Sequence, residues 1–545
     1  MLIATLGGCG EFGANVTAYY YKGFLFLVDC GIAFPKPHLL GIDAVIINAQ
    51  DLIEAWGGNI HAYILTHGHE DHIGAVSHYL KKWEAPIYCS SWTAKLLSNK
   101  LSRAGLSKNL NDISVITMNQ TISFTNHLTV RWLPVNHSIP MTASLLISTN
   151  EVNIFHTGDF KIDRTPVGEP PFNFEQFDQL PPKIDLLLAD STNATHKGWT
   201  PSESIVTKEI TTLLGTLSGL IVFTTFSSHF WRILSLINAC HAQNKKLLIL
   251  GTSMTRTIDI ASELGFHSPL SQILITDIEA KKIDRSKLVI LATGSQGEPL
   301  AALSRLLRDN WPTIRLREDD CVIFSSRTIP GNEREVLELK ALCHYKHINI
   351  LDVGTNPNIH VSGHAYQEDL AWLIKKLNPK YFLPVHGSYT HLNANKKIIS
   401  NLGLEKITIL PSDNGTVLSI KNQKCQPIEP IGIDRLFIDS QSHIPIDKKT
   451  LNQRLKIGHN GIVIVAGVLS KNKNRLRHLS IEYIGCPPLP QTIKDDLEKK
   501  IQKTLTENSH LQTGEMNEIC RTTVRRQVKQ VLNKRLVVVS KIFVC

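Results

Sequence analysis

The chain has 545 residues, of which 42% are hydrophobic and 19% are charged. This composition excludes a largely disordered chain, and the length exceeds what one hydrophobic core organises, so we expect roughly two to four domains. The formal net charge of +10 falls entirely in residues 451–545, which hold 17 Lys and Arg residues against 7 Asp and Glu residues. Such asymmetry is typical of a protein with a polyanionic partner such as nucleic acid, although a solvated helix face explains it equally well.

The composition also bears on membranes and redox state. The longest apolar stretches, such as 461–469, fall short of the roughly 20 residues that a membrane span requires, so we expect no membrane partner. Residues 1–13 are rich in glycine and lack basic residues before the apolar ones, which indicates a strand and turn rather than a signal peptide. The ten cysteines show no CxxC spacing, which argues against a zinc ribbon or disulfide scaffold and favours a reducing cytoplasm.

Short apolar runs separated by turns fill residues 1–200, the first part of the first domain that we expect. Helical patterns lie between some of these runs, which indicates mixed sheets covered by helices. The predicted strands are 2–6, 17–21, 24–29, 62–66, 87–89, 128–135, 142–148, 152–157 and 184–189.

The rhythm changes in residues 201–351, where long helical patterns alternate with fully apolar runs. Continuous apolar strands between helices indicate a doubly wound parallel sheet. Turn residues follow these strands, which is typical of a site at the carboxyl ends of a sheet. The predicted strands are 219–225, 246–251, 287–292 and 320–325.

The last third of the chain divides into three segments. Residues 352–420 return to histidine-containing motifs, so we interpret 201–351 as an insertion into one domain whose second part is 352–420. Residues 421–452 have the composition of a looser connector. The basic tail, 453–545, has the pattern strand, strand, helix, helix, strand, which predicts a small α/β module.

The densest chemical signal lies where the predicted strand 62–66 runs into a glycine turn. Four candidate ligands, three imidazoles and one carboxylate, fall within six residues: His67, His69, Asp71 and His72. Imidazole and carboxylate suit zinc, and a turn lets four side chains diverge toward two metals. The alternative is a histidine-rich surface turn, against which the density of the pattern argues.

Three further residues near predicted strand ends have the chemistry that a two-metal site needs. They are His137, Asp159 and His386. Singly, each is as compatible with an ordinary loop or turn residue as with a ligand. Together they supply the ligands that the first cluster lacks.

Residues 66–74 match the HxHxDH signature of the metallo-β-lactamase superfamily. The chain as a whole resembles the ribonuclease J family, in the β-CASP branch that processes nucleic acid. It departs from the usual family pattern at Met141, at Ser388 and in residues 226–232, none of which is a candidate ligand. The matching stretches run in family order and are 7–13, 28–31, 135–140, 156–160, 189–194, 293–299, 329–333, 360–364 and 384–387.

The resemblance implies an α/β architecture and a metal site. The fold would be a metallo-β-lactamase αββα sandwich with an inserted, doubly wound β-CASP domain and a small C-terminal α/β domain. Two Zn²⁺ would bind per chain. Asp159 would bridge the ions and so take part in catalysis, and Asp29 would support a ligand from behind. One ion would take His67, His69 and His137, and the other Asp71, His72 and His386.

The resemblance also implies residues that act on the substrate. His364 would protonate or stabilise the leaving 3′ oxygen, and Asp190 would orient its imidazole. From the sequence alone, Asp190 is equally a turn or cap residue and His364 a loop histidine. Residues 294–297 and Arg327 are weaker candidates for contacts along the path of the nucleic-acid substrate. A turn with free backbone N–H groups would bind substrate phosphate, and it comprises His360, Val361, Ser362, Gly363, His364 and Ala365.

The implied activity is hydrolysis of phosphodiester bonds in single-stranded RNA, as in RNA processing and decay. The direction would be 5′ to 3′, with endonuclease action left open. Two metals about 3.5–4 Å apart can share a hydroxide nucleophile and stabilise charge on the phosphoryl oxygens. The alternatives are a DNA-directed β-CASP nuclease and a catalytically silent RNA-binding subunit. By the same resemblance, the C-terminal domain would form a homo-oligomer, either a dimer or a tetramer, and its charge fits attraction of RNA equally well.

Overall fold

The computed structural model describes residues 1–36, 38–266, 268–471, 476–486, 490–508, 510–533 and 536–545. Contacts between residues divide the chain into two compact units. The first comprises residues 1–34 and 45–435, and the second comprises residues 35–44 and 436–545. Within the described residues, no helix is both long and apolar enough to cross a bilayer.

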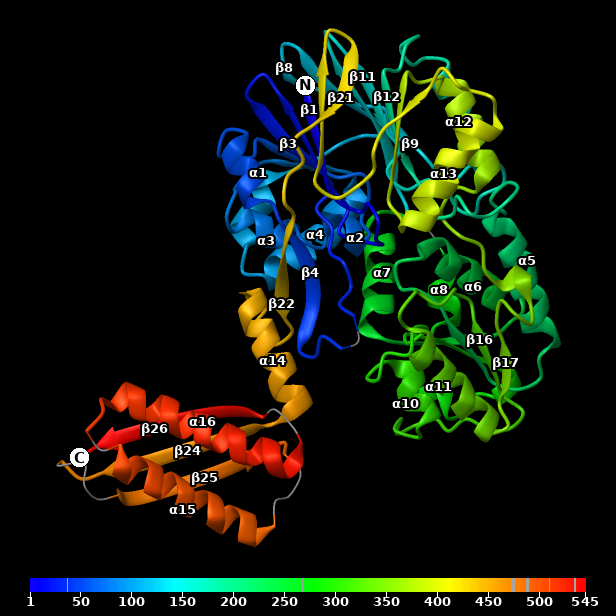
Figure 1. Ribbon diagram of the computed structural model, residues 1–545. Helices are drawn as coiled ribbons and strands as arrows, with labels where there is room; N and C mark the ends of the chain where they lie inside the picture. Colours follow the sequence, from blue (N-terminus) through cyan, green and yellow to red (C-terminus); the bar gives the residue numbers. More distant parts are fainter. Residues whose placement is uncertain (37, 267, 472–475, 487–489, 509, 534–535) are drawn as a thin grey trace. The chain divides into compact units, whose positions relative to one another are not determined.

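Two sheets lie face to face in the first unit (Figure 1). The eight-stranded sheet has the order β21-β20-β1-β2-β3-β5-β6-β7, and the seven-stranded sheet has the order β19-β18-β12-β11-β10-β9-β8. The strands of the first are β21 (Lys424–Ile428), β20 (Thr416–Lys421), β1 (Leu2–Gly7), β2 (Val16–Tyr21), β3 (Phe24–Val28), β5 (Ala62–Ile64), β6 (Ile87–Cys89) and β7 (Ile113–Val115). Those of the second are β19 (Thr408–Ile409), β18 (Tyr381–Val385), β12 (Leu186–Asp190), β11 (Asn153–His156), β10 (Ala143–Thr149), β9 (Leu128–Pro134) and β8 (Thr121–Thr125).

Alternation of side chains along the strands gives each sheet an apolar inner face. Tyr19, Phe26, Trp132 and Leu145 are fully buried in one cluster between the two sheets. Helices cover the outer faces, with α1 (Gln50–Ala55), α3 (Val76–Leu80) and α4 (Ser91–Arg103) beside the first sheet and α12 (Gln367–Leu377) and α13 (Tyr389–Asn401) on the second (Figure 1). The αββα sandwich predicted from the sequence is therefore confirmed.

The inserted segment forms a five-stranded parallel sheet of order β14-β15-β13-β16-β17. Helices pack on both of its faces, α5, α6 and α7 on one and α10 and α11 on the other. This confirms the doubly wound sheet that the sequence predicts. The strands are β13 (Ile221–Thr224), β14 (Lys246–Leu250), β15 (Leu288–Ala292), β16 (Cys321–Phe324) and β17 (Asn349–Leu351). The helices are α5 (Glu203–Thr216), α6 (Phe230–Ala242), α7 (Thr252–Glu263), α10 (Ala302–Leu307) and α11 (Glu333–Tyr345).

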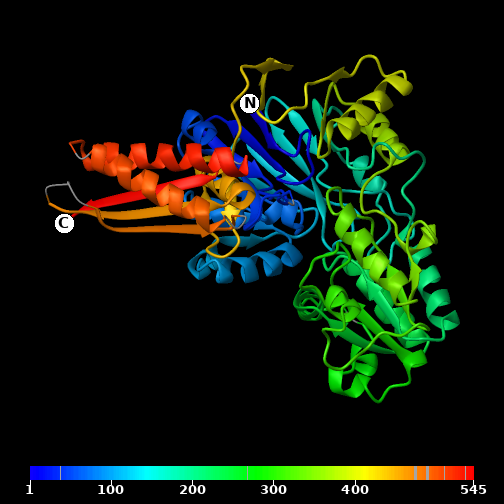
Figure 2. The same cartoon turned by 60° about the horizontal axis from the view of Figure 1, so that its bottom comes forward.

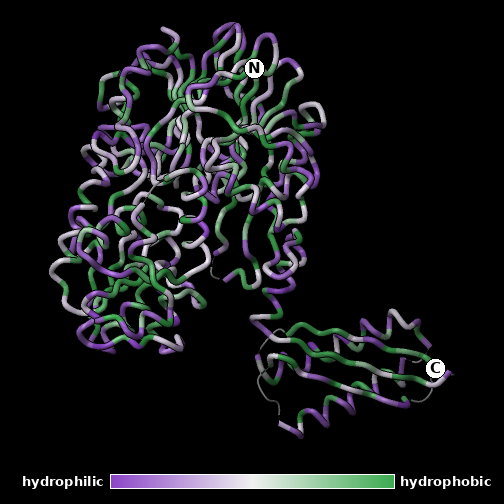
Figure 3. The backbone as a smooth tube through the Cα atoms, turned by 180° about the vertical axis from the view of Figure 1, so that it is seen from behind, coloured by the Kyte–Doolittle hydropathy of each residue, from purple (hydrophilic) through white to green (hydrophobic). Residues whose placement is uncertain are grey.

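The second unit contains the small α/β module. Its three-stranded sheet has the order β25-β24-β26, with β24 (Ile462–Leu469), β25 (Leu476–Ile484) and β26 (Val537–Val544). Helices α15 (Gln491–Glu507) and α16 (Thr513–Leu532) pack on one face of this sheet (Figure 2). The strands are the most hydrophobic segments of the module (Figure 3), as expected for elements that carry its core.

The structure differs from the sequence-based expectation in residues 421–452, which we expected to be a looser connector. This segment contains β21, which extends the first sheet, and β22 (Asp434–Asp439), which pairs with β23 (Pro445–Ile446). Helix α14 (Lys448–Asn460) begins before the expected module does. β21 is largely exposed and β22 is only partly buried, so neither shows a clean alternation of apolar and polar residues that the sequence pattern would reveal.

Candidate metal centre and active site

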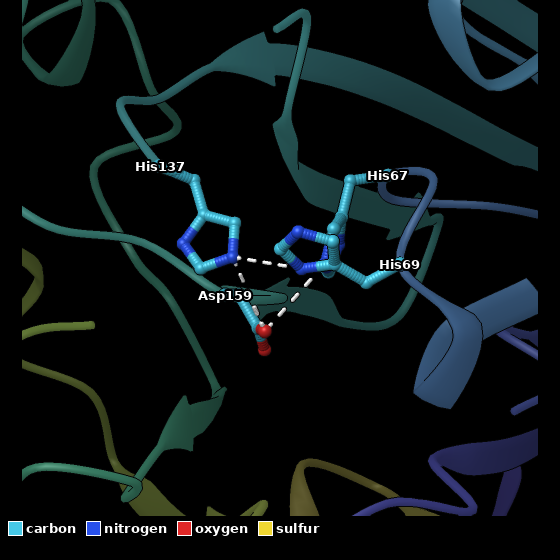
Figure 4. A group of neighbouring side chains, drawn as sticks. All are labelled: His67, His69, His137 and Asp159. Carbon is cyan, nitrogen blue, oxygen red and sulfur yellow. Dashed lines mark hydrogen bonds and ion pairs between the residues drawn. The ribbon is translucent and has the colours of Figure 1, made fainter. Parts of the chain in front are cut away.

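Four side chains from three loops converge on one point (Figure 4). His67 and His69 follow β5, His137 follows β9, and Asp159 follows β11. Nδ1 of His69 lies 3.0 Å from Nε2 of His67 and 3.2 Å from Nε2 of His137. Oδ2 of Asp159 lies 3.5 Å from Nε2 of His67. Two ligands of a tetrahedral zinc ion, each about 2.0–2.1 Å from the metal, are about 3.3 Å apart, so these four atoms have the spacing of a zinc ligand set.

A second group of four side chains shares Asp159 with the first. Asp71 and His72 belong to α2 (Glu70–Ile73), and His386 follows β18. Nε2 of His72 lies 3.3 Å from Oδ1 of Asp159, and Nε2 of His386 lies 3.3 Å from Oδ2 of Asp71. The two oxygens of Asp159 therefore face different groups. The structure thus brings together every residue that we predicted as a ligand, with the predicted bridging carboxylate between the two sets.

Asp29 lies behind His72, where the sequence-based reasoning placed it. Its Oδ2 accepts a hydrogen bond from Nδ1 of His72 at 2.7 Å, and its Oδ1 accepts one from the backbone N–H of Thr66 at 2.8 Å. This contact selects the tautomer of His72 whose Nε2 lone pair faces the second group. Asp29 and His386 have φ angles of +57° and +54°, a conformation that is costly without glycine and that gathers at functional sites.

The two groups differ in their electrostatics. Burial lowers the pKa of His67 and His137 well below the ordinary value and lowers the pKa of His69 to about 4. These imidazoles are neutral at pH 7 and present lone pairs. In the second group, burial acts against a charged His386, but the Asp159 and Asp71 carboxylates outweigh it and raise its pKa to about 10. This group therefore attracts positive charge, which a divalent cation supplies, and the nitrogen and oxygen donors fit zinc.

His364 and Asp190 form a contact pair beside the ligand groups. Nδ1 of His364 lies 2.8 Å from Oδ2 of Asp190 and 3.8 Å from Oδ2 of Asp159. Burial favours the neutral imidazole, but the Asp190 and Asp159 carboxylates outweigh it and hold the pKa of His364 above its ordinary value. A protonated imidazole in this position is equipped to donate a proton to a leaving group.

Comparisons with known proteins agree with this geometry. Family profiles match residues 8–204 (beta-lactamase superfamily domain), residues 218–341 (ribonuclease J, beta-CASP domain) and residues 355–410 (Zn-dependent metallo-hydrolase RNA specificity domain). Ribonuclease J of Helicobacter pylori is 33% identical over 87% of this chain and 68% of its own length. Ribonuclease J of Sinorhizobium meliloti is 31% identical over 99% of this chain and 96% of its own length. The chain belongs to the ribonuclease J family.

Membership confirms the family resemblance that the motifs indicated. The protein is a metal-dependent ribonuclease of the metallo-hydrolase class. A solved structure of a protein of unknown function from Enterococcus faecalis matches with a TM-score of 0.50 and 17% identity, over 78% of this chain and 99% of that one. This last likeness shows a shared fold alone.

The turn 360–365 approaches the ligands of this ribonuclease J-family protein through Gly363. The carbonyl of Gly363 accepts a hydrogen bond from Nδ1 of His137 at 2.7 Å. A Cβ atom at position 363 would lie 2.8 Å from that imidazole, so only glycine fits without displacing a ligand. Oγ of Ser362 accepts a hydrogen bond from Nδ2 of Asn193 at 2.6 Å, which fixes the turn on its other side.

Three of the six residues that we predicted to bind substrate face the protein interior. The side chains of His360, Val361 and Ala365 are 9%, 4% and 1% exposed. Arg232, fully buried on α6, holds this part of the turn, because its guanidinium donates to the carbonyl of Val361 at 3.3 Å and contacts Nδ1 of His360 at 3.2 Å. The carboxylate of Glu203 pairs with the same guanidinium. These three side chains therefore contribute structure, and Ser362 and His364 are the partly exposed residues of the turn.

Asn15 contacts the metal centre and was missed by the sequence-based reasoning. Its Nδ2 donates to Oδ2 of Asp71 at 3.2 Å and lies 3.1 Å from Nε2 of His72. Its backbone N–H also donates to the carbonyl of Asp71 at 3.0 Å. The only signal in the sequence was its position just after the glycine-rich turn 7–13, which we interpreted as a strand and turn.

Proposed function

We propose that the protein is a two-zinc ribonuclease that hydrolyses single-stranded RNA from the 5′ end toward the 3′ end, in RNA processing and decay. The observation that carries this proposal is the pair of ligand groups that share Asp159, with the His364–Asp190 pair beside them. Bound zinc supplies a nucleophile at neutral pH, since it lowers the pKa of water to about 7, and it stabilises charge on the phosphoryl oxygens.

The residues of the chain have separate tasks in this proposal. Asp29 orients one ligand, and the turn 360–365 binds a substrate phosphate through its backbone N–H groups. His364 donates a proton to the leaving 3′ oxygen while Asp190 holds its Nδ1. His67, His69 and His137 would hold one zinc ion, Asp71, His72 and His386 would hold the other, and Asp159 would belong to both ligand sets.

We assign residues 1–200 and 352–420 to the catalytic domain and residues 201–351 to the insertion. The insertion supplies one wall of the RNA path, because the loops at the carboxyl ends of its strands carry polar side chains. The cysteines are free, and most are buried. This usage fits a reducing compartment, so we place the enzyme in the cytoplasm.

Digestion of RNA tests the activity. A 5′-monophosphorylated single-stranded RNA, labelled at either end, is incubated with zinc-replete protein beside DNA of the same sequence. We expect mononucleotides to be released from the 5′ end of the RNA. The variant Asp71→Ala, His72→Ala should abolish this release, whereas the matched variant His127→Ala, Asp178→Ala, at exposed positions, should retain it.

The other outcomes overturn the proposal in different ways. Cleavage of DNA alone would indicate a DNA-directed nuclease, and tight RNA binding without cleavage would indicate a silent subunit. A circular RNA, which has no ends, reports endonuclease action separately. Mass spectrometry under native conditions counts the metals, and one zinc ion per chain at saturation would contradict the two-zinc site.

We also propose that the module 453–545 joins copies of the chain into a dimer or tetramer. Helices cover one face of its sheet, and on the opposite face Ile484, Val539 and Phe543 are 51%, 38% and 55% exposed. Exposed apolar patches of this kind mark association sites. Light scattering should find an oligomer for the wild type and a smaller species for Phe543→Lys. A wild-type monomer would contradict the proposal.

A further inference from the structure

Arg327 carries a half-buried positive charge whose polar partners are uncharged. One terminal nitrogen of its guanidinium, Nη1, lies 3.1 Å from Nε2 of His196, and the other, Nη2, donates to the hydroxyl of Tyr366 at 3.2 Å. Burial and the nearby guanidinium both lower the pKa of His196, so its imidazole is neutral and accepts the hydrogen bond. Of the carboxylates in the described part of the chain, none lies within 4.0 Å of this guanidinium. A partly buried charge is costly unless an opposite charge compensates it, so a bound anion would stabilise Arg327.

A glutamine side chain fixes the loop that carries Arg327. Nε2 of Gln296 donates to the carbonyl of Arg327 at 3.0 Å, and Oε1 of Gln296 accepts from the backbone N–H of Ile329 at 2.7 Å. Gln296 follows β15 and Arg327 follows β16, so the side chain ties together two loops at the carboxyl ends of these strands. Arg327 is therefore held from its backbone as well as from its side chain.

The position of these loops is the one where doubly wound sheets bind ligands. In the order β14-β15-β13-β16-β17, the chain first runs from β13 to one edge and back, and then crosses to the other side of β13. Ligands bind outside the carboxyl ends of the strands, where the direction of winding reverses. The loops after β15 and β16 flank this reversal, so Gln296 and Arg327 lie at its rim.

The partners of Arg327 connect this rim to the candidate active site. Tyr366 comes two residues after His364, and His196 comes six residues after Asp190. The rings of His196 and Tyr366 are stacked, with centroids 4.9 Å apart and planes at 28°. The two segments that supply His364 and Asp190 thus also supply Tyr366 and His196, the two side chains that contact the Arg327 guanidinium.

We propose that Arg327, anchored by His196 and Tyr366, binds a backbone phosphate of the RNA outside the metal centre, in an inference that rests on the proposed ribonuclease function. A guanidinium presents paired N–H donors that match a phosphate, and a phosphodiester is the anion that the substrate brings to this rim. The contact holds the strand between the insertion and the catalytic domain while the scissile bond is at the metals.

The test compares Arg327→Met with Arg315→Met, which removes the same charge from an exposed position before β16. For Arg327→Met, the KM for single-stranded RNA should rise about ten- to a hundredfold, the effect of losing a charge-assisted hydrogen bond. Hydrolysis of bis(p-nitrophenyl) phosphate, which reaches only the metal centre, should not change. Arg315→Met should match the wild type in both reactions. Arg327→Lys, which keeps the charge but not the fork of donors, should fall between the wild type and Arg327→Met.

Binding separates this inference from the proposed activity. RNA affinity is measured by fluorescence anisotropy in the Asp71→Ala, His72→Ala background, where cleavage does not interfere. Loss of one phosphate contact should lower the slope of log affinity against log salt by about 0.7 for a single strand. An unchanged slope with an unchanged KM for RNA would overturn the role of Arg327. If Arg327→Met changed only the inhibition by a nucleoside monophosphate, the proposed role of Arg327 would also be overturned, because Arg327 would then bind the product and not the RNA strand. If the wild type did not cut RNA, the proposed function would fail, and the anisotropy would still decide the contact.

Discussion

Replacing Arg232 with methionine should both lower the free energy of unfolding and raise the KM for RNA. The side chain is fully buried, and its guanidinium pairs with the Glu203 carboxylate, which is 3% exposed. Removing one member of a buried ion pair costs about 3–5 kcal/mol, because the other charge remains without compensation. The double variant Arg232→Met, Glu203→Leu removes both charges. Its free energy of unfolding should therefore recover in part, with a coupling energy near the upper end of the range of about 0.5–3 kcal/mol that neighbouring residues show; the buried carbonyls that Arg232 bonded still lack a donor.

RNA binding should not recover with stability. In the double variant the carbonyls of Ile359 and Val361 still lack the donor that positions the turn beside Gly363. We expect a raised KM for RNA in both variants, with hydrolysis of a small phosphodiester retained in the double variant. Urea unfolding followed by tryptophan fluorescence, together with steady-state kinetics, measures both effects. A double variant with wild-type KM for RNA would refute the reasoning that Arg232 positions this turn.

Three further predictions concern the support of the metal centre, the core and pH. Asp29→Ala should lower zinc affinity about 10- to 100-fold, because His72 loses the acceptor that orients it. Competition with a chromogenic chelator measures this affinity, and a wild-type value would contradict the prediction. Phe155→Ala, at a fully buried position, should lower the free energy of unfolding by about 3–5 kcal/mol, as measured by denaturant unfolding. Phe34→Ala, at a position 59% exposed, should change it by less than about 0.5 kcal/mol. Burial raises the pKa of Glu169 from 4.5 to about 8, so the folded protein holds this proton more tightly than the unfolded chain. The resulting stability is present in full below pH 4.5 and is lost as the pH rises to 8, so the wild type should fall relative to Glu169→Gln over this range, and parallel stability curves would disprove the shift.

The sequence predicts best the strands that are buried on both faces. Strand β15 is apolar at every position because helices cover both sides of its sheet, so its run of five residues stands out from its surroundings. Strands β8 and β7 were not predicted. They lie at the edges of their sheets and are largely exposed or short, so their residues show neither a continuous apolar run nor a clean alternation.

Some residues of the site could be predicted from their neighbours in the sequence, and others could not. His67, His69, Asp71 and His72 are adjacent in the sequence, and their density alone indicates a metal. Asn15 has no such neighbours, because its role depends on Asp71, which lies 56 positions away. Arg232 is likewise one cation in an apolar helix, and its role depends on Ile359, which lies 127 positions away. Such residues gain a function only from contacts that the fold creates.

The inserted domain has a structural role at the metal centre as well as a place in the RNA path. Nδ1 of His137 donates to the carbonyl of Gly363, 226 positions along the chain, and the whole insertion lies between these two residues. The turn that carries Gly363 is fixed by Arg232 from the first part of the insertion, and Tyr366 just beyond it contacts Arg327 from the last part. The chain therefore returns to the ligands in the correct position only if the insertion has folded. A variant whose insertion does not fold should thus lose the chemistry even though every metal ligand is intact, and this dependence links RNA capture to the assembly of the catalytic site.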